Sequence, residues 1–238
     1  MLIPVSPAGG SDVPIGTSRL GGTPDLPDGW NWPAAEPTED CDQPLFLPFL
    51  AQFNLADLPL AIHTLPRSGR IYIFAAQEDA DENANVVLFD DGPVDRLKRH
   101  PDPCEGMYAD EDFDEAFGVL AIREFLPAVS LPDHCGWADD EDAFINDGHA
   151  DQYSELRQAL LAYEGQKEPV SRVGGYLYSP YGGEPDDDQW QLLVQIESYF
   201  GDGIEMNFWD AGCQQVFAKS LAPVDGRIPE TQATVFSM

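Results

Sequence analysis

Three short motifs occur twice along this 238-residue chain, and the two copies keep the same order. The motifs are Ser18–Gly22 and Ser171–Gly175, Leu50–Asn54 and Leu193–Glu197, and Gly69–Phe74 and Gly203–Phe208. The separation between copies falls from 153 to 143 to 134 residues, so the second copy has shorter connections. One such repeat can arise by chance, whereas three in the same order predict an internal duplication.

The first copy has the pattern of a small antiparallel unit. A Gly-Gly turn precedes a strand around a glutamine, and after a loop a second strand follows a single glycine. Arg70–Phe74 is rich in β-branched and aromatic residues and is predicted to form a hairpin with Asn85–Phe89. Pro48 interrupts the apolar run before Leu50, which predicts that this segment enters the sheet at an edge or a bulge.

The second copy repeats this pattern with weaker signals. Gln191–Glu197 places apolar residues at alternate positions and predicts a strand, while Gly203–Trp209 alternates less cleanly. The 21 glycines and 21 prolines of the chain are typical of many short strands joined by turns. Both copies are therefore predicted to be mainly antiparallel sheet.

Two helices are predicted between the copies. Gln152–Tyr163 carries apolar residues at helical spacing, and Gly165 follows it as a stop signal. Asp110–Gly118 is the second candidate, because acids fill its first turn. The chain is therefore predicted to be an α+β, β-rich antiparallel fold, internally duplicated into two pseudo-equivalent half-units with a few short helices. The expected organisation is a single domain over 1–238, with repeat 1 at about 15–92, a helical and acidic linker at about 93–165, and repeat 2 at about 166–238.

The charge of the chain restricts its partners. There are 43 acidic and 12 basic residues, which give a net charge of −31 and a pI near 4.1. Nucleic acid and anionic membrane surfaces are excluded as expected partners, because both need a basic footprint. Two interpretations stay open: solubility in a salt-adapted host, which the three lysines fit, or a surface matched to a basic protein.

The thiols and the start of the chain favour the cytoplasm. Cys41, Cys104, Cys135 and Cys213 are scattered and have no metal-type spacing. The first residues lack the basic and long apolar regions of a secretory signal, and no apolar run approaches the ~20 residues of a membrane span. Reduced thiols in a cytoplasmic protein are the expectation.

Two pairs of polar residues occupy equivalent places in the repeat. Arg19 and Arg172 either bind a carboxylate or phosphate in a shared cleft, or pair with a local acid or a turn carbonyl. Gln52 and Gln195 each interrupt an apolar strand, where a buried amide satisfies loop backbone or contributes to the same cleft.

The linker mixes acids with aromatic residues. Its first acidic stretch consists of Asp110, Glu111, Asp112, Asp114 and Glu115, and a second spans residues 139–142. Aromatic side chains beside them are suited to anchor a basic partner that the acids would orient. The alternative is a solvated loop and helix face whose aromatic residues turn into the core.

No metal, cofactor or catalytic set is predicted. Residues 79–90 mimic the ligand spacing of a calcium-binding loop, but Ala84 replaces the required glycine, so a solvated hairpin loop is the better interpretation. The four histidines are dispersed, and no nucleophile motif occurs. Whether the chain is an enzyme stays open, and a non-enzymatic role is favoured.

The first copy resembles a known family. Ser18–Pro24, Leu26–Pro27 and Trp32–Pro33, followed by Leu50–Leu55, are similar to the start of the YwqG-like bacterial domain-of-unknown-function family. The resemblance resumes at Gly174–Gly175 and Leu193–Gly203 and covers roughly residues 15–225. The chain departs from the family by its short lead before Ser18 and by an acidic insertion before Gln189. The resemblance implies a bacterial cytosolic protein, with some members encoded near toxin and immunity genes.

Three hypotheses about function follow. The leading one is a non-enzymatic protein-binding module, such as an immunity-type inhibitor that covers a basic toxin. The second is an enzyme or small-ligand binder that uses a cleft between the repeats, in which the guanidinium groups of Arg19 and Arg172 converge. The third is a housekeeping protein of a salt-adapted host. The oligomeric state stays open.

Overall fold

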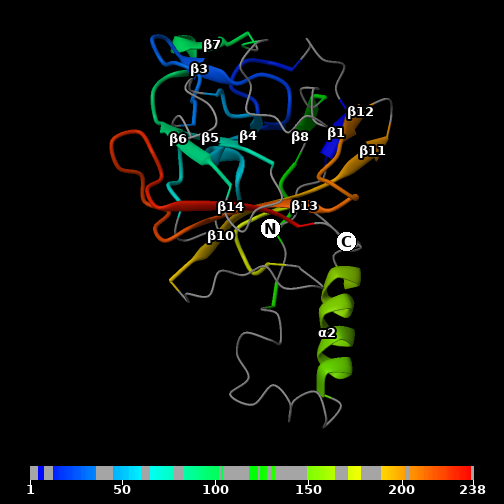
Figure 1. The fold of residues 1–238 in the computed structure, drawn as a ribbon. Helices are drawn as coiled ribbons and strands as arrows, with labels where there is room; N and C mark the ends of the chain where they lie inside the picture. The colour runs from blue at the N-terminus through cyan, green and yellow to red at the C-terminus, as the bar shows by residue number, and fades with distance from the viewer. Residues whose placement is uncertain are drawn as a thin grey trace.

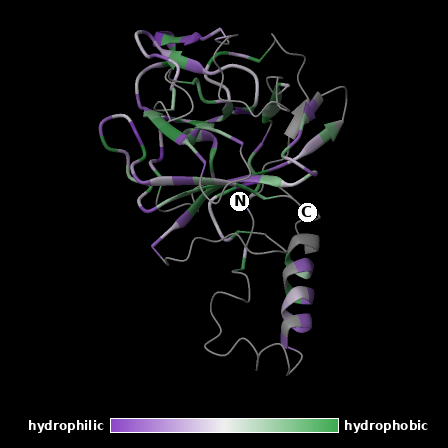
Figure 2. Cartoon of the chain, viewed as in Figure 1, coloured by the Kyte–Doolittle hydropathy of each residue, from purple (hydrophilic) through white to green (hydrophobic). Residues whose placement is uncertain are grey.

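The computed structural model describes residues 5–7, 13–35, 45–59, 65–77, 83–101, 103, 118–122, 124–127, 130–131, 149–163, 171–177, 189–201 and 204–236. Strands dominate these residues, and α2 (His149–Tyr163) lies apart from the sheets (Figure 1). Figure 2 shows hydrophilic bands along this helix, while the strands above it in the view carry most of the hydrophobic residues. No helix in the described ranges is long and apolar enough to cross a bilayer.

Residues from the first half of the chain form a six-stranded antiparallel sheet. Its strands, in spatial order, are β1 (Val5–Pro7), β8 (Leu120–Ile122), β2 (Arg19–Leu20), β4 (Phe49–Asn54), β5 (Arg70–Ala75) and β6 (Asn85–Asp90). β5 and β6 pair along their whole length, from Arg70 opposite Asp90 to Ala75 opposite Asn85. The hairpin predicted from the β-branched and aromatic residues is confirmed.

Residues from the second half form a separate four-stranded antiparallel sheet. Its order is β14 (Thr231–Phe236), β13 (Cys213–Ala218), β10 (Gln191–Glu197) and β9 (Arg172–Val173). Two small ribbons accompany the sheets: β3 (Asp25–Pro27) pairs with β7 (Leu97–Arg99), and β11 (Tyr199–Gly201) pairs with β12 (Ile204–Met206). The described residues also contain the short 3-10 helices η2 (Leu55–Asp57), which follows β4, and η3 (Val94–Arg96), which precedes β7.

The main core contains residues from both sheets. Leu20, Phe53 and Ile71 of the six-stranded sheet belong to the same buried cluster as Val173 and Val216 of the four-stranded sheet. Side chains alternate between the two faces of a strand, so the residues between these lie on the outer faces. A second cluster that includes Trp32, Tyr72 and Phe74 covers the outer face of the six-stranded sheet. This second layer holds the polar groups described below.

The two sheets are also joined along one edge. Asn83, two residues before β6, bridges Ala233 of β14, and its N–H donates to the Ala233 carbonyl at 2.8 Å. The N–H of Phe89 donates to the Gly226 carbonyl at 2.8 Å, and the N–H of Ile228 donates to the Val87 carbonyl at 3.0 Å. The chain around 226–228 therefore covers the outer edge of β6, whose backbone groups would otherwise be open to pairing with another chain.

Around two arginine–glutamine pairs, the strand registers of the two sheets correspond. Arg19 in β2 lies opposite Gln52 in β4, and Arg172 in β9 lies opposite Gln195 in β10. These are the four residues that the repeated motifs singled out. The structure thus gives each pair the same position in its own sheet, although the two sheets do not share a strand.

Pro48 lies immediately before β4, as its position in the sequence predicts. The register of β4 against β5 shifts between Phe49 and Ala51. The same irregularity occurs in the other sheet, where the register of β10 against β13 shifts between Leu192 and Val194. The register shift agrees with the predicted entry of this segment at a bulge, but the matching shift in β10, which no proline directly precedes, shows that the irregularity does not depend on Pro48.

The third repeated motif does not mark equivalent strands. β5, which includes the first copy, lies beside β4, but β12, which includes part of the second copy, pairs only with β11. The strand beside β10 is instead β13, which follows Gly212. The prediction failed here because a glycine followed by alternating apolar residues specifies a strand but not its partner.

The prediction of an α+β, β-rich antiparallel fold is confirmed at the level of sheets, with one α-helix in the described part of the chain. The helix predicted at Gln152–Tyr163 is confirmed and begins three residues earlier, at His149. The helix predicted at Asp110–Gly118 falls almost wholly outside the described residues. The linker is predicted to contain only loops and helices, but it also contributes the strands β7 and β8. The sequence did not indicate them because a strand of three residues shows too little periodicity.

Candidate functional site

A buried ionic cluster lies on the outer face of the six-stranded sheet. Arg19 is 1% exposed and donates to the Asp25 carboxylate at 2.8 Å, and it also donates to the carbonyl of Thr23. Arg99 of β7 donates from Nε to the other Asp25 oxygen at 2.9 Å. The ribbon of β3 and β7 positions this cluster, since Asp25 is the register partner of Arg99.

Gln52 completes the cluster from β4. Its Nε2 group donates to Asp25 Oδ2 at 2.9 Å and to the Thr17 carbonyl at 2.8 Å, and its Oε1 accepts the Asp25 N–H at 2.9 Å. Gly16 N–H donates to the same carboxylate at 2.8 Å. The Asp25 carboxylate thus accepts hydrogen bonds from four groups, close to the number that its two oxygens can take.

The electrostatics of the cluster keep Asp25 ionised. Burial by itself raises the pKa of this carboxyl, but the hydrogen bonds from Arg19 and Arg99 and the positive charge of Arg19 outweigh it. The pKa of Asp25 therefore lies below its usual range. A buried carboxylate that is held ionised and paired with two arginines is not poised to exchange a proton near neutral pH, so it does not suit the role of a general acid or base.

A second ionic pair lies farther along the same face. Arg70 of β5 donates to Asp90 of β6 at 2.5 Å and to the carbonyl of Gly92, and both charged side chains are buried. Arg96 approaches the other Asp90 oxygen at 3.8 Å. Tyr72 lies in β5, two residues after Arg70, and its burial raises the pKa of its hydroxyl well above the usual value. This pair ties the β5–β6 hairpin to the turn that follows it.

The four-stranded sheet carries polar groups at the matching positions. Arg172 is 3% exposed and donates to the carbonyl of Tyr176 at 3.2 Å, four residues ahead, as Arg19 does with Thr23. Gln195 donates to Glu197 at 2.6 Å and lies 3.8 Å from the Cys213 sulfur. Burial, with the negative charge of Glu197, raises the pKa of the Cys213 thiol to about 12. This thiol is therefore neutral and buried.

Arg19 and Arg172 do not form a shared cleft. Their neighbours Leu20 and Val173 both point into the core between the sheets, so the two arginines lie on the outer faces with that core between them. The prediction that their guanidinium groups converge is wrong. The alternation of the strands decides this, because equivalent positions in two sheets that pack face to face point in opposite directions.

The contacts of the predicted site residues are with the protein itself. Arg19 and Arg172 each donate to a turn carbonyl, and Gln52 bonds loop backbone, as the alternative interpretation of these residues expects. The acidic stretch at 110–115 lies outside the described residues, so its role in docking stays a prediction. Among the described residues, no group of three or more His, Cys, Asp or Glu side chains could hold a metal ion.

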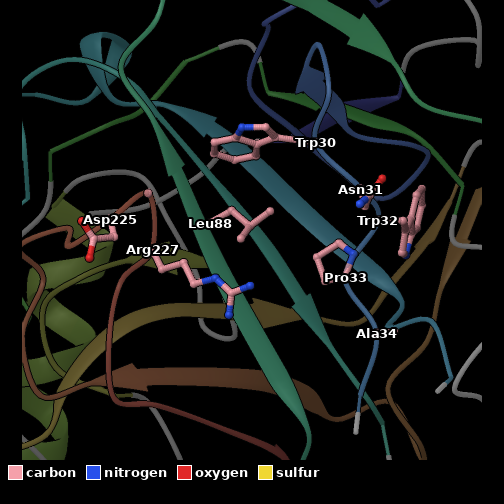
Figure 3. Close-up of a pocket in the computed structure, with 9 residues that line it drawn as sticks. Trp30, Asn31, Trp32, Pro33, Ala34, Leu88, Asp225 and Arg227 are labelled. Carbon is pink, nitrogen blue, oxygen red and sulfur yellow. The ribbon is translucent and has the colours of Figure 1, made fainter.

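A hollow of about 440 Å³ lies elsewhere, near the edge of β6. Residues 30–34 form one wall, Leu88 of β6 forms the floor, and the turn at 225–227 forms the opposite wall. Figure 3 shows the Trp30 ring on one side of Leu88 and the Arg227 side chain on the other, with Trp32 and Pro33 closing a further side. The hollow therefore combines aromatic surface with a guanidinium group from the other half of the chain.

Comparison with known families gives a match that covers most of the chain. The family model described as "Domain of unknown function (DUF1963)" matches residues 18–222, from just before β2 to four residues beyond β13. The chain belongs to this family. No curated protein matches the chain. The matched span of DUF1963 includes both arginine–glutamine pairs but ends before the turn at 225–227 that closes the hollow.

Sequence reasoning missed several residues of these clusters. Asp25 and Arg99 are 74 residues apart, and nothing in their local sequence indicates that they pair. Trp30 and Arg227 are separated still further, and only the contact of the two halves brings them to one hollow. One signal was present at the turn: Asp225-Gly226 is the dipeptide preferred in the tightest hairpins.

Proposed function

We propose that this DUF1963 chain is a non-catalytic binding domain whose acidic exterior docks a basic protein. The observation that carries the proposal is the way in which the molecule uses its few cations. Arg19 and Arg99 both pair with Asp25, Arg70 and Arg96 both pair with Asp90, and Lys98 pairs with Asp28. Five of the twelve basic residues thus converge on three of the 43 acids.

The remaining charges are far from balanced. Seven basic residues are left for 40 acids, so even one partner for each of them leaves 33 acids without a cation. Arg19, Arg70 and Arg172 are also buried, so they add no positive charge to the surface. Such a field accelerates encounter with a positively charged partner and selects against acidic ones.

The buried polar groups support a binding role over a catalytic one. Asp25 is held charged by two arginines, and the thiol of Cys213 is held neutral by burial. Catalytic acids, bases and nucleophiles instead need a pKa near the working pH and a position facing a cleft. Both clusters face the outer layers of their own sheets and bond the segments that surround them.

The finer form of the proposal is an immunity-type inhibitor in the bacterial cytoplasm. It rests on the resemblance of Ser18–Pro24 and Leu50–Leu55 to the YwqG-like family, some members of which are encoded near toxin genes. In this form the acidic stretch at 110–115 supplies the charge of the docking surface, and the neighbouring aromatic residues supply the buried area. The competing explanation is a housekeeping protein in a salty cytoplasm, whose acids have no partner.

The test is affinity capture of the tagged full chain from its own cells at low and moderate salt, with the retained proteins identified by mass spectrometry. A basic protein retained at low salt and shed at moderate salt supports the proposal. It is then titrated against a variant in which Asp110, Glu111, Asp112, Asp114 and Glu115 become the corresponding amides. Binding in this variant is expected to fall by more than tenfold, mainly through slower association.

A matched control removes the same number of charges elsewhere. Asp91, Asp95, Glu124, Glu205 and Asp210 are exposed acids, and their amide variant has the same net charge as the first. This control is expected to bind within a few-fold of the wild type. If both variants lose the same affinity, the docking surface is not at 110–115 and the attraction is only a general effect of net charge. If no basic protein is retained at either salt concentration, the proposal fails.

We also infer that the two sheets descend from one duplicated unit. The shared register of the arginine–glutamine pairs, the matching shift in β4 and β10, and the two arginine–carbonyl bonds four residues ahead support it. Ser18 and Ser171 add a further parallel, because their hydroxyls accept the N–H of Asn54 and Glu197, respectively. An experimental structure tests this inference: residues 17–22 with 49–75 should superpose on 170–175 with 192–218. A superposition that needs a different register would contradict it.

A further inference from the structure

We propose that the hollow between residues 30–34, Leu88 and the turn at 225–227 is a binding site for a small aromatic monocarboxylate. This inference goes beyond the proposed docking of a basic protein and does not depend on it. The hollow has a volume of about 440 Å³, which lies within the range of small-molecule sites.

The wall that contains the tryptophans is fixed by contacts behind it. Trp32 is 8% exposed, and its Nε1–H donates to the Leu47 carbonyl at 2.8 Å. Its ring packs edge-on against Phe74 with centroids 5.6 Å apart, and Trp30 packs in the same way on Tyr72 at 6.4 Å. The indole of Trp30 is half-buried, so one part of it stays available as an apolar surface. A wall held in this way does not need to be ordered when a ligand arrives.

The opposite wall is a closed turn. Val224 and Arg227 exchange backbone hydrogen bonds at 2.7 and 3.0 Å, and the two residues between them, Asp225 and Gly226, have φ values of 48° and 77°. Positive φ at both central positions is the geometry of the tight hairpin turn that Asp-Gly favours. The Gly226 carbonyl accepts the Phe89 N–H at 2.8 Å, which locks the turn onto β6. The backbone of Arg227 is therefore held in place at the rim.

The guanidinium group of Arg227 has no ion pair or hydrogen bond with any residue that the structure describes. Arg67 shares this property but does not line the hollow, and Asp225 in the same turn forms no ion pair with Arg227. Figure 3 shows the Arg227 side chain extending toward Leu88 while the Asp225 carboxylate points to the other side. The planar guanidinium group is suited to a planar carboxylate, with which it can form two parallel hydrogen bonds.

The surroundings specify the rest of the ligand. The exposed part of the Trp30 indole favours a flat ring, which packs on it in an offset or edge-on arrangement. The net charge of −31 and the carboxylate of Asp225 at the rim oppose a dianion more than a monoanion. The geometry therefore fits one carboxylate on an aromatic ring better than a phosphate ester.

The test uses the full chain, labelled with ¹⁵N, and benzoate and indole-3-acetate as probes. The indole N–H signal of Trp30, assigned by its loss in Trp30→Phe, is expected to shift with saturation at millimolar probe concentration. Trp190 is the internal control, because it packs with Leu192 and Phe217 on the other sheet. Benzamide and indole-3-acetamide keep the rings but lack the charge, and they are expected to bind at least about tenfold more weakly.

Arg227→Gln is expected to weaken binding of both carboxylates by about tenfold or more, because it removes the charge but keeps a polar side chain of similar length. Arg67→Gln is the matched control, since Arg67 is an exposed arginine that does not line the hollow. It makes the same change in net charge and is expected to bind like the wild type. Both variants lie on the surface, so their thermal unfolding should match that of the wild type.

Several results would overturn the proposal. The Trp30 signal could stay unmoved with both carboxylates, or the amides could bind as tightly as the acids. Equal losses in Arg227→Gln and Arg67→Gln would show a general charge effect and no site. Tighter binding of phenyl phosphate than of benzoate would refute the monocarboxylate assignment. None of these results bears on the capture of a basic protein, so the two proposals fail separately.

Discussion

At the scale of single residues, the Asp25 carboxylate links several separate segments of the first half of the chain. It accepts hydrogen bonds from Arg19 in β2, Arg99 in β7, Gln52 in β4 and the backbone of Gly16. Four segments far apart in the sequence therefore meet at one charge. Removing Arg19 and Asp25 fully and Arg99 partly from water costs free energy, and this cost is offset only while every partner is present.

Asp25→Asn is expected to lower the free energy of unfolding by about 3–5 kcal/mol, because it leaves two arginines near the core without their counter-charge. Urea unfolding followed by tryptophan fluorescence measures this. The control is Asp28→Asn, whose partner Lys98 and own side chain are 69% and 58% exposed. An exposed pair contributes about 0–1 kcal/mol, so the control should unfold almost like the wild type. Equal losses in the two variants would contradict a special role for Asp25.

The stability difference between the wild type and Asp25→Asn is expected to depend on pH. The pKa of Asp25 in the folded state lies below its ordinary value of 3.8, so the folded protein holds this proton less tightly than the unfolded chain does. The stabilisation is present above that pH and is lost as pH falls through the folded pKa. The gap between wild type and Asp25→Asn should stay constant above about pH 5 and narrow below 3.8. A gap that widens in acid would contradict the assignment.

At the scale of elements, the Gly-Gly turns position the arginine strands. β2 and β9 are only two residues long, so the turns after them decide where they lie. Gly21 donates its N–H to the Leu50 carbonyl at 2.8 Å, and Gly174 donates to the Leu193 carbonyl at 2.9 Å. Each turn thus closes onto the neighbouring strand of its own sheet. Both glycines have positive φ, which side chains rarely adopt.

Gly22→Ala is expected to destabilise the protein by about 2–4 kcal/mol, since it combines backbone strain with overpacking. Gly22 has φ +70°, and an added Cβ would lie 2.4 Å from a Val119 methyl carbon. Gly29 has φ +85° but nothing within 4 Å, so Gly29→Ala should cost only about 1 kcal/mol for the strain. Adding Val119→Ala to Gly22→Ala should recover part of the loss. Thermal unfolding of the four proteins checks the order, and a Gly29 variant as unstable as the Gly22 variant would contradict it.

At the scale of the whole molecule, charge opposes folding. The net charge of −31 repels itself in the compact state more than in the unfolded chain, and five cations are concentrated on three acids. The core between the sheets and the layer on the six-stranded sheet therefore hold the fold against this repulsion. The same field is what a basic partner would neutralise.

Salt is expected to raise the melting temperature by several degrees between about 10 mM and 500 mM NaCl, because it screens the repulsion between the acids. The rise should be smaller in the amide variant of Asp91, Asp95, Glu124, Glu205 and Asp210, whose exposed charges no longer contribute. Calorimetry or circular dichroism at each salt concentration measures it. A melting temperature that is independent of salt would show that the acids are neutralised within the protein.

Local sequence was sufficient where neighbouring residues decide the outcome. The β5–β6 hairpin follows from β-branched and aromatic residues, and α2 follows from apolar residues at helical spacing. The charge field also follows from composition alone, because 12 cations cannot balance 43 acids in any fold. Family membership rests on the same information, since the match over residues 18–222 uses only the order of residues.

Tertiary structure decided which of these elements meet. The repeated glycine motif predicted a partner strand at 203–208, but β13 takes that place, because pairing depends on packing between distant segments. The directions in which Arg19 and Arg172 point depend on how the two sheets pack around their common core. The pairing of Asp25 with Arg99 depends on the β3–β7 ribbon, which joins residues 74 positions apart. The hollow between Trp30 and Arg227 exists only because the turn at 225–227 closes onto β6. Periodicity and propensity describe neighbours along the chain, whereas these contacts join segments whose separation in sequence carries no information about their separation in space.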